Sequence, residues 1–318
     1  MADRLAAARA RVATAGFVLA TVPLAALLIL RLVGIGGNRF IVGALALTPY
    51  IAAGGAILGC ACLMLRRWRI AGVALVLTIV LAATLLPRLL PNDQPPAGGA
   101  TVRIMALNLH VGQADAAKVV EQVREHNVDI LCLLELTPTA VFDLHEAGLF
   151  DVLKHPSLRP AEGGGGVGIV SRYSLTTRPS PAAAGYTATV DTPGHSSIDV
   201  MAVHTLMPLN VPAERWRANL AELPPAAGEK ARPRVLAGDF NATLDHAGLR
   251  EVLDTGYVDA AAQRGEGLTP TWSGGVLPPP VAIDHILVGT LTAVSDFEVL
   301  DISGSDHKAV YAEIVLPA

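Results

Sequence analysis

The sequence is short of charge, aromatic rings and cysteine. Charged residues make up only 16% of its 318 residues, whereas 52% are hydrophobic and the mean hydropathy is +0.46. This balance excludes an ordinary soluble fold for the whole chain. Cys60, Cys62 and Cys132 are too few and too dispersed for a disulfide framework or a cysteine zinc site, and their apolar surroundings predict buried, inert thiols.

Charge is almost absent from three runs near the amino terminus. The only charged residue in the first run is Arg31. The second run contains none, and the third contains none before Arg88, near its end. An apolar helix of about 20 residues crosses the roughly 30 Å hydrocarbon core of a bilayer. A cleavable signal peptide is the alternative, but it leaves the second and third runs unexplained. We therefore expect a membrane domain over residues 1–90 with three transmembrane helices, at about 12–33, 41–65 and 70–90.

Arginines are unevenly distributed around these runs. The amino terminus and the loop after the second run each contain three arginines, whereas the loop between the first two runs contains only Arg39. Basic residues favour the cytoplasmic side of a membrane. The sequence thus predicts a multi-pass plasma-membrane protein with a cytoplasmic amino terminus. Three crossings then leave the rest of the chain extracytoplasmic.

A linker rich in proline and glycine, residues 91–100, separates the apolar part from a chain of mixed composition. Residues 1–100 contain nine arginines, no lysine and two acidic residues. The whole chain contains 24 basic and 28 acidic residues, so residues 101–318 contain 15 basic and 26 acidic ones, a net charge of −11. Nucleic acids are bound largely through lysine and arginine. This composition therefore makes nucleic acid an unlikely partner.

Short β-rich runs recur after the linker, and helical spacing lies between some of them, notably at 115–127 and 213–226. Several of these runs follow one another without a helix, which favours a mixed α/β sheet system with helices outside. The expected strands lie in VRIMALNL, VDILCLLEL, VGIVSRY, SIDVMAVH, RVLAGDFN, AIDHILV and KAVYAEIVL.

Polar residues stand where these apolar strands stop. Any one of them is explained by a turn, but an acid after LCLL must be exposed at the strand end or paired. If the strand ends share one rim, these side chains suit a hard divalent cation and a phosphate. The residues are Asn108, Glu135, His204, Asp239, Asn241, Asp284, Asp306 and His307.

The motifs around these residues resemble the endonuclease/exonuclease/phosphatase superfamily, which includes deoxyribonuclease I and inositol-polyphosphate phosphatases. The resemblance covers residues 101–318 in the family's order. It is carried by Asn108, LLE ending at Glu135, VHTxxP at His204, GDFN at 238–241, IDH at 283–285 and SDH at 305–307. The three apolar runs in front, with TPTWSGG before IDH, resemble the VanJ-type membrane proteins linked to teicoplanin resistance.

The family resemblance implies an α/β fold, a four-layered α/β/β/α sandwich preceded by the three transmembrane helices. It also implies Mg²⁺ or Mn²⁺ at the rim, held by Glu135 with Asn108 and Asp306. A turn beginning at Gly238 would let Asp239 and Asn241 both face the substrate.

The resemblance further implies catalytic roles. Asp239 would orient or deprotonate the attacking water, and Asn241 would donate to a phosphoryl oxygen. His307 and His204 would hydrogen-bond the phosphate, and Asp284 would hold His204 in the required tautomer. Trp272 of TPTW is equally consistent with a pocket wall and with simple packing.

These features predict a membrane-anchored, metal-dependent phosphohydrolase acting outside the cytoplasm. Its expected substrate is a phosphoester or pyrophosphate on a lipid, such as a cell-envelope lipid carrier or a phospholipid, with membrane lipids as partners and a contribution to glycopeptide resistance. The alternatives are an extracytoplasmic nuclease or phosphodiesterase, and a catalytically silent membrane-tethered binding module. A channel is disfavoured because the apolar runs contain no acid, lysine or histidine.

Overall fold

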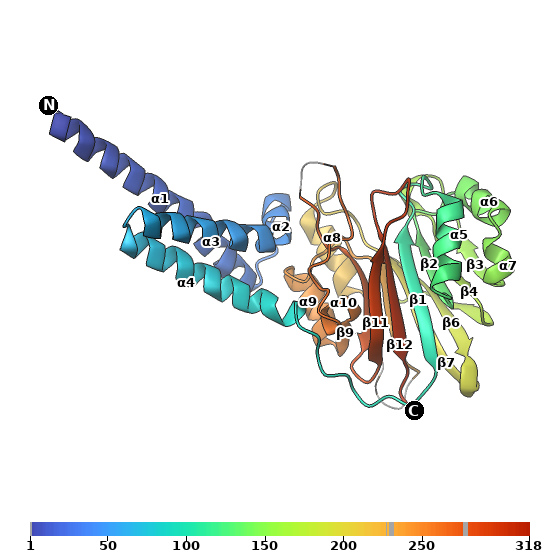
Figure 1. The fold of residues 1–318 in the computed structure, drawn as a ribbon. Helices are drawn as coiled ribbons and strands as arrows, with labels where there is room; N and C mark the ends of the chain where they lie inside the picture. The colour runs from blue at the N-terminus through green and yellow to red at the C-terminus, as the bar shows by residue number, and fades with distance from the viewer. Residues whose placement is uncertain (1, 227, 229–231, 276–278) are drawn as a thin grey trace.

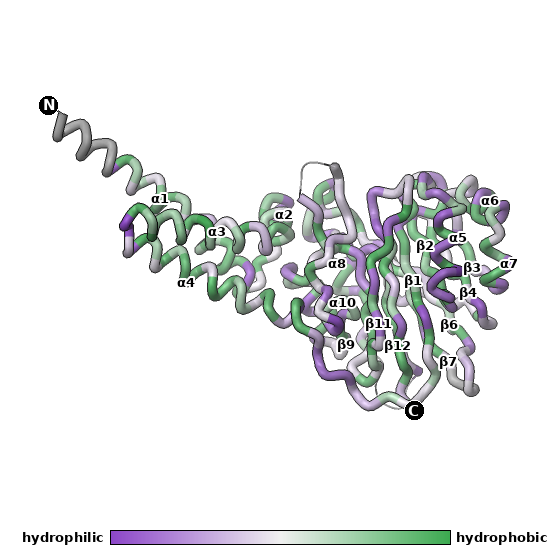
Figure 2. Tube along the Cα trace, viewed as in Figure 1, coloured by the Kyte–Doolittle hydropathy of each residue, from purple (hydrophilic) through white to green (hydrophobic). Residues whose placement is uncertain are grey.

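In the computed structural model, an arm of helices precedes a β-sandwich (Figure 1). The structure describes residues 2–226, 228, 232–275 and 279–318. The arm is apolar along most of its length, whereas apolar and polar residues are mixed in the sandwich (Figure 2). The arm consists of α1 (Ala2–Val33), α2 (Arg39–Ala46), α3 (Thr48–Met64), α4 (Trp68–Leu85) and the 3-10 turn η1 (Leu86–Arg88).

Two segments of the arm, Arg11–Val33 and Trp68–Arg88, are long and apolar enough to cross a membrane. The helix pair α2 and α3 forms a third such segment only if its two bent halves count as one span. Three transmembrane helices are therefore not confirmed. Of the three thiols, Cys60 is exposed, so the prediction that it is buried is wrong, whereas Cys62 and Cys132 are buried as expected.

The expectation of one continuous helix over 41–65 is wrong, because α2 and α3 meet at a bend of 66°. Pro49 lies in the first turn of α3 and has no N–H with which to continue the hydrogen bonding of α2. The carbonyl of Leu45 accepts instead from the Thr48 hydroxyl, at 2.6 Å. The bend leaves α2 free to pack against the sandwich.

Two six-stranded sheets form the sandwich, and both are mixed. Their strand orders are β11-β12-β1-β2-β4-β3 and β5-β6-β7-β8-β10-β9, with β1 parallel to β2, β7 parallel to β8 and all other pairs antiparallel. The strands are β1 (Thr101–Asn108), β2 (Ile130–Leu134), β3 (His155–Arg159), β4 (Val167–Ser171), β5 (Leu175–Arg178), β6 (Gly185–Thr192), β7 (Ser196–His204), β8 (Arg234–Asp239), β9 (Tyr257–Asp259), β10 (Asp284–Gly289), β11 (Ala293–Leu300) and β12 (Ala309–Val315).

Alternation along the strands builds the layers. In β1, Ile104 packs in the core between the sheets, whereas Met105 packs under the helices on the outer face. The outer face of the second sheet is covered by a core that includes Trp216 and Leu249. The remaining helical elements are α5 (Ala116–Glu125), α6 (Pro138–Glu146), α7 (Leu149–Val152), η2 (Gly163–Gly165), η3 (Pro193–His195), α8 (Ala213–Ala221), α9 (Ala247–Asp254) and α10 (Ala260–Gln263).

The expected α/β sandwich is thus confirmed, and each expected strand is present. The helix expected at 115–127 is α5, and the one expected at 213–226 is α8, which ends earlier, at Ala221. Strands β3, β5, β6, β9 and β11 and helices α6, α7, α9 and α10 were not anticipated.

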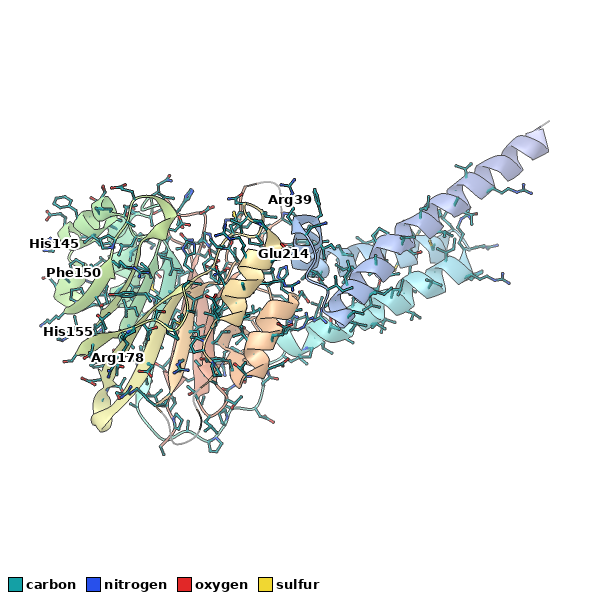
Figure 3. All side chains as sticks on the ribbon, turned by 180° about the vertical axis from the view of Figure 1, so that it is seen from behind. Arg39, His145, Phe150, His155, Arg178 and Glu214 are labelled. Atoms are coloured by element: carbon teal, nitrogen blue, oxygen red, sulfur yellow. The ribbon has the colours of Figure 1, made fainter. Side chains whose placement is uncertain are left out.

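Buried ion pairs fasten the arm to the sandwich. Asp245 accepts from Arg31 at the end of α1 (2.6 Å) and from Arg88 of η1 (2.9 Å), and all three side chains are buried. Arg217 of α8 donates to the carbonyl of Gly36, at 2.9 Å. Arg39 of α2 and Glu214 of α8 mark this junction in Figure 3.

Replacing Asp245 with asparagine leaves Arg31 and Arg88 buried without a counter-charge. We expect the free energy of unfolding to fall by about 3–5 kcal/mol, the effect of breaking a buried ion pair. Thermal unfolding in detergent measures this change. Asp254→Asn removes the same charge from an exposed position of α9 and is the control. Equal unfolding midpoints for the two variants would show that the ion pairs do not stabilise the junction.

Candidate functional site

The strand topology brings the polar strand ends to one rim. Asn108 ends β1 and Glu135 follows β2, and these strands are parallel neighbours. His204 ends β7 and Asp239 ends β8, which are parallel neighbours in the other sheet. Asp284 begins β10 directly opposite Asp239, and His307 precedes β12, the antiparallel neighbour of β1. Parallel strands and the starts of their antiparallel neighbours share one edge of each sheet.

The Asn108 amide joins the two sheets at this rim. Its Nδ2 donates to Glu135 Oε1 and to Asp239 Oδ2, both at 3.2 Å. Its Oδ1 accepts from the backbone of His110, at 2.9 Å. In this arrangement Asn108 orients two carboxylates toward each other, and the prediction that it is also a metal ligand stays a prediction.

The backbone around Glu135 is strained. Glu135, His110 and Val111 all have positive φ, of 53°, 49° and 53°. This region is uncommon for residues other than glycine and is least favourable for a β-branched one such as Val111. In return, the Val111 backbone donates to Glu135 Oε2 at 2.7 Å. This hydrogen bond, together with that from Asn108, holds the carboxylate in place at the rim.

Asp239 and Asn241 do face the same pocket, but the turn begins later than expected. Gly238 still lies within β8, and Asn241 has φ 48°. The turn closes when the Asn241 backbone donates to Asp239 Oδ1 at 2.7 Å. Gly238 is required for another reason: a Cβ there would lie 2.2 Å from the Val203 carbonyl oxygen of β7.

Asp284 pairs with His307, so the expected pairing of Asp284 with His204 is wrong. His307 Nδ1 lies 3.0 and 3.1 Å from the two Asp284 oxygens, and Thr271 donates to Asp284 at 2.6 Å. The packing of the two sheets explains the difference, because β10 contacts β12 across the sandwich and brings Asp284 beside the residue that precedes β12. His204 instead lies with its Nε2 3.6 Å from Glu135.

Burial and charge shift two pKa values at the rim. Burial lowers the pKa of His307, but the charges of Asp284 and Asp239 outweigh it and raise the value to about 10. Burial, together with the charge of Asp284, raises the pKa of Asp239, although His307 and His204 counteract this shift. His307 is thus a cation at neutral pH, with its Nε2 3.8 Å from Asp239 Oδ2.

Asp306 lies away from this group. Its carboxylate accepts from the Trp272 indole at 2.9 Å and lies 3.6 Å from His110 Nδ1. The Trp272 ring also lies near the His307 ring, with ring centroids 6.4 Å apart. Trp272 therefore contacts two residues of the predicted site, Asp306 and His307. The role of Asp306 as a metal ligand stays a prediction.

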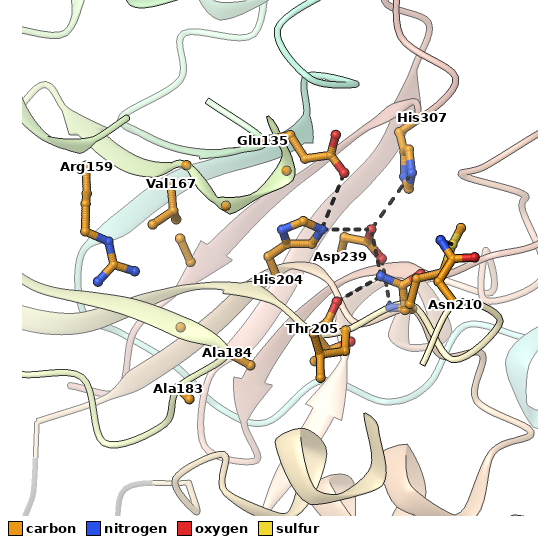
Figure 4. A pocket seen from close by; sticks show the side chains of 18 residues that line it. Glu135, Arg159, Val167, Ala183, Ala184, His204, Thr205, Asn210, Asp239 and His307 are labelled. Atoms are coloured by element: carbon orange, nitrogen blue, oxygen red, sulfur yellow. Dashed lines mark hydrogen bonds and ion pairs between the residues drawn. The ribbon is translucent and has the colours of Figure 1, made fainter. Parts of the chain in front are cut away.

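A pocket of about 490 Å³ opens over the rim (Figure 4). Of the residues expected at the site, Glu135, His204, Asp239, Asn241 and His307 line it. Dashed lines in Figure 4 link Glu135, His204, Asp239 and His307, which come from both sheets.

The pocket also contains residues that the sequence analysis did not identify: Arg159, Gly164, Thr205 and Asn210. Arg159 ends β3 and brings a cation to the pocket wall opposite His307 (Figure 4). A Cβ on Gly164 would lie 3.6 Å from Glu135 Oε1. The GGGG run was the available signal for this wall, because glycine is favoured where backbone comes close to a site.

The donor atoms fit a hard divalent cation. In the described part of the chain, Asp239, Asp284 and His307 form one group of side chains whose ligand atoms lie within 4.8 Å of one another. Both Asp284 oxygens, however, are engaged by His307 and Thr271. The Glu135 and Asp239 carboxylates, held together by Asn108, are the better match, since Mg²⁺ and Mn²⁺ prefer oxygen ligands.

Comparison with known proteins supports the same fold and family. The endonuclease/exonuclease/phosphatase family model matches residues 105–307. No curated protein sequence matches the chain.

Solved structures of similar fold include three relatives of low sequence identity. An endonuclease/exonuclease/phosphatase from Beutenbergia cavernae has a TM-score of 0.52 and 20% identity over 69% of this chain and 72% of its own. TDP2 from D. rerio, complexed with a single-strand DNA product, has a TM-score of 0.52 and 17% identity over 68% and 99%. A mannosyl-6-phosphatase from Bacteroides thetaiotaomicron has a TM-score of 0.52 and 15% identity over 68% and 100%.

At these identities the structural likeness shows the fold alone, and the proteins named act on different compounds. The family itself is shown by the match over residues 105–307, most of the sandwich. Its members are phosphoester hydrolases that typically depend on a divalent metal. This chain belongs to the endonuclease/exonuclease/phosphatase family.

Proposed function

We propose that this chain is a membrane-anchored, divalent-metal-dependent phosphohydrolase that acts on a lipid-linked phosphoester or pyrophosphate outside the cytoplasm. One observation carries the enzymatic part of the proposal. The Asn108 amide holds Glu135 and Asp239 together at the rim of the pocket, and the cationic His307 lies beside them, with its Nε2 3.8 Å from Asp239. A catalytically silent binding module would need neither the raised pKa values nor the strained backbone of Glu135.

The side chains divide the chemistry of phosphate hydrolysis between them. The raised pKa of Asp239 makes its carboxylate a better base toward an attacking water. Protonated His307 donates from Nε2 to a nonbridging oxygen, with Asp284 fixing its ring through Nδ1. His204 contributes a further donor from the same wall. The Asn241 amide donates to the Thr205 carbonyl and to Asp239 in this structure, so it would have to exchange one of these partners to donate to a phosphoryl oxygen.

The metal assignment follows the family. Glu135 is the principal ligand that we propose for Mg²⁺ or Mn²⁺, with Asn108 beside it and Asp306 as a further contributor. A bound divalent cation supplies charge neutralisation for the phosphoryl oxygens.

The proposed substrate and location are supported by charge and hydrophobicity elsewhere in the chain. The net charge of −11 after residue 100 disfavours nucleic acid, as calculated above, and the apolar arm favours a substrate in the bilayer. The arginine distribution supports a cytoplasmic amino terminus, three crossings and an extracytoplasmic sandwich. TPTWSGG and the arm support a VanJ-type role in the cell envelope and in glycopeptide resistance.

Replacing Glu135 with glutamine keeps the shape of the side chain but removes its charge. We expect Mg²⁺-dependent hydrolysis to fall about 10²-fold or more, because the metal contributes several kcal/mol to the transition state. Calorimetric titration with Mg²⁺ and Mn²⁺ should show weakened binding in the same variant. Glu251→Gln, an exposed position of α9, is the control. Metal binding that is equal in both variants would contradict the assignment.

The Asp284–His307 pair predicts a pH dependence. His307 stays protonated until the pH approaches about 10. Asp284→Asn removes the charge that raises the pKa of His307 most, so this pKa should fall toward 6.5. The alkaline limb of the kcat/KM profile should then move to lower pH.

Two measurements check this expectation: the pH profile of activity, and NMR titration of His307 in the metal-free protein. Asp143→Asn, which removes an exposed charge on α6, should leave both unchanged. An Asp284→Asn profile identical to that of the wild type would contradict the pairing.

A substrate panel tests the proposed class. We expect the purified protein with Mg²⁺ to hydrolyse lipid pyrophosphates or phospholipids in preference to DNA, and Glu135→Gln to abolish that activity. Phosphate release and DNA cleavage are measured on the same preparation. Preferential cleavage of DNA would overturn the lipid assignment and favour the nuclease alternative.

A further inference from the structure

A second cavity lies beside the site, where the arm meets the sandwich. It has a volume of about 160 Å³ and an almost entirely apolar lining. Four segments form it: α2, the loop after β7, the loop after β8 and the segment before β10. We call this cavity the α2 groove and define it by Val42, Gly43, Ala46, Leu209, Val281 and Ile283.

The α2 groove adjoins the pocket over the rim. Met207 and Asn241 line both cavities. Asn241 faces Asp239 through its amide, at 3.2 Å. A molecule seated with a phosphate at the rim therefore has an apolar cavity next to that phosphate, on the side of the arm.

The other end of the α2 groove lies at the apolar arm. Helix α2 follows α1, one of the two segments long enough to cross a membrane, and turns back into α3. Phe40 of α2 is 73% exposed and Leu209, on the groove wall, is 45% exposed. Exposed apolar side chains beside a membrane-length helix favour contact with lipid rather than with water.

The α2 groove is held open by fixed contacts. His246 Nε2 donates to the carbonyl of Val42 at 2.9 Å, and Tyr50 of α3 donates to the carbonyl of Pro280 at 2.7 Å. Val42 itself is part of the buried core beneath α8 and α9. These contacts attach α2 to the sandwich on one side of the groove without filling it.

We propose that the α2 groove binds the hydrocarbon chain of the substrate and leads it from the bilayer to the rim. This inference rests on the proposed function, because it assigns the apolar part of the same substrate. The occupant is a hydrocarbon chain, since the lining offers little polar surface to a sugar or a nucleotide. The phosphate end lies at Asn241 and Asp239, and the chain passes Met207 and Ile283 toward α2.

Gly43 allows a direct test. Gly43 lines the groove, and a Cβ at this position meets nothing within 4 Å, so Gly43→Leu adds a side chain at the groove without a clash at its first atom. Gly54 of α3 is equally open but faces outward from the arm, so Gly54→Leu is the matched control. Both changes favour helix, which keeps folding comparable.

The kinetic measurement is the ratio of kcat/KM for tetradecyl diphosphate to that for ethyl diphosphate. We expect Gly43→Leu to lower this ratio about tenfold, the loss expected when about two methylene groups leave an apolar contact. Gly54→Leu should keep the wild-type ratio. Dimyristoyl and dibutyryl phosphatidic acids form a second pair that tells a two-chain headgroup lipid from a single-chain phosphate. An unchanged ratio in Gly43→Leu for both pairs would overturn the proposal that the α2 groove binds the hydrocarbon chain.

A binding measurement separates this inference from the proposed function. Tetradecyl phosphate with a diazirine at the chain end is cross-linked to Glu135→Gln protein, which does not turn over. We expect labelling of the segments that contain Leu209 and Val281, and loss of that label when Gly43→Leu is added. Label spread evenly along α1 and α4 would overturn the groove. Wild-type protein that hydrolyses neither diphosphate nor phosphatidic acid would overturn the proposed function, while the labelling still decides the groove.

Discussion

The site depends on the groups packed around one carboxylate, Asp239, where water hardly reaches it. Its residue is only 2% exposed, and an unpaired polar group in such surroundings is strongly unfavourable. The partners of this carboxylate come from both sheets: the Asn241 backbone at 2.7 Å, the Asn108 amide at 3.2 Å and the His307 ring at 3.8 Å. The two sheets must therefore pack in one register for these partners to reach the carboxylate.

The location of the site could be predicted from the sequence because polar residues interrupt apolar strands at their ends, as at Asn108 and Glu135. The partnership of Asp284 with His307 could not, because it depends on how β10 of one sheet packs against β12 of the other, which no local pattern encodes. Arg159 was missed for a different reason. Its strand, HPSLR, carries no apolar alternation, so nothing in the sequence marked its end as part of the rim.

In the arm, too, contacts with distant residues could not be predicted from local sequence patterns. Composition alone identified the apolar runs, and it correctly placed helices there. Arg31 and Arg88 are both paired with Asp245, which lies 214 and 157 positions away in the chain. No local pattern in the apolar runs predicts these ion pairs.

The bend at Pro49 links the two halves of the molecule. A straight helix over 41–65 would carry Val42 away from the core beneath α8, and the wall of the α2 groove with it. The bend instead turns α2 along the sandwich, and His246 and Asp245, adjacent in sequence, fasten α2 and the ends of α1 and α4. The position of the rim relative to the arm is thus fixed by buried contacts rather than by the linker. The lipid-linked substrate that we propose would therefore reach the rim from the direction of the arm.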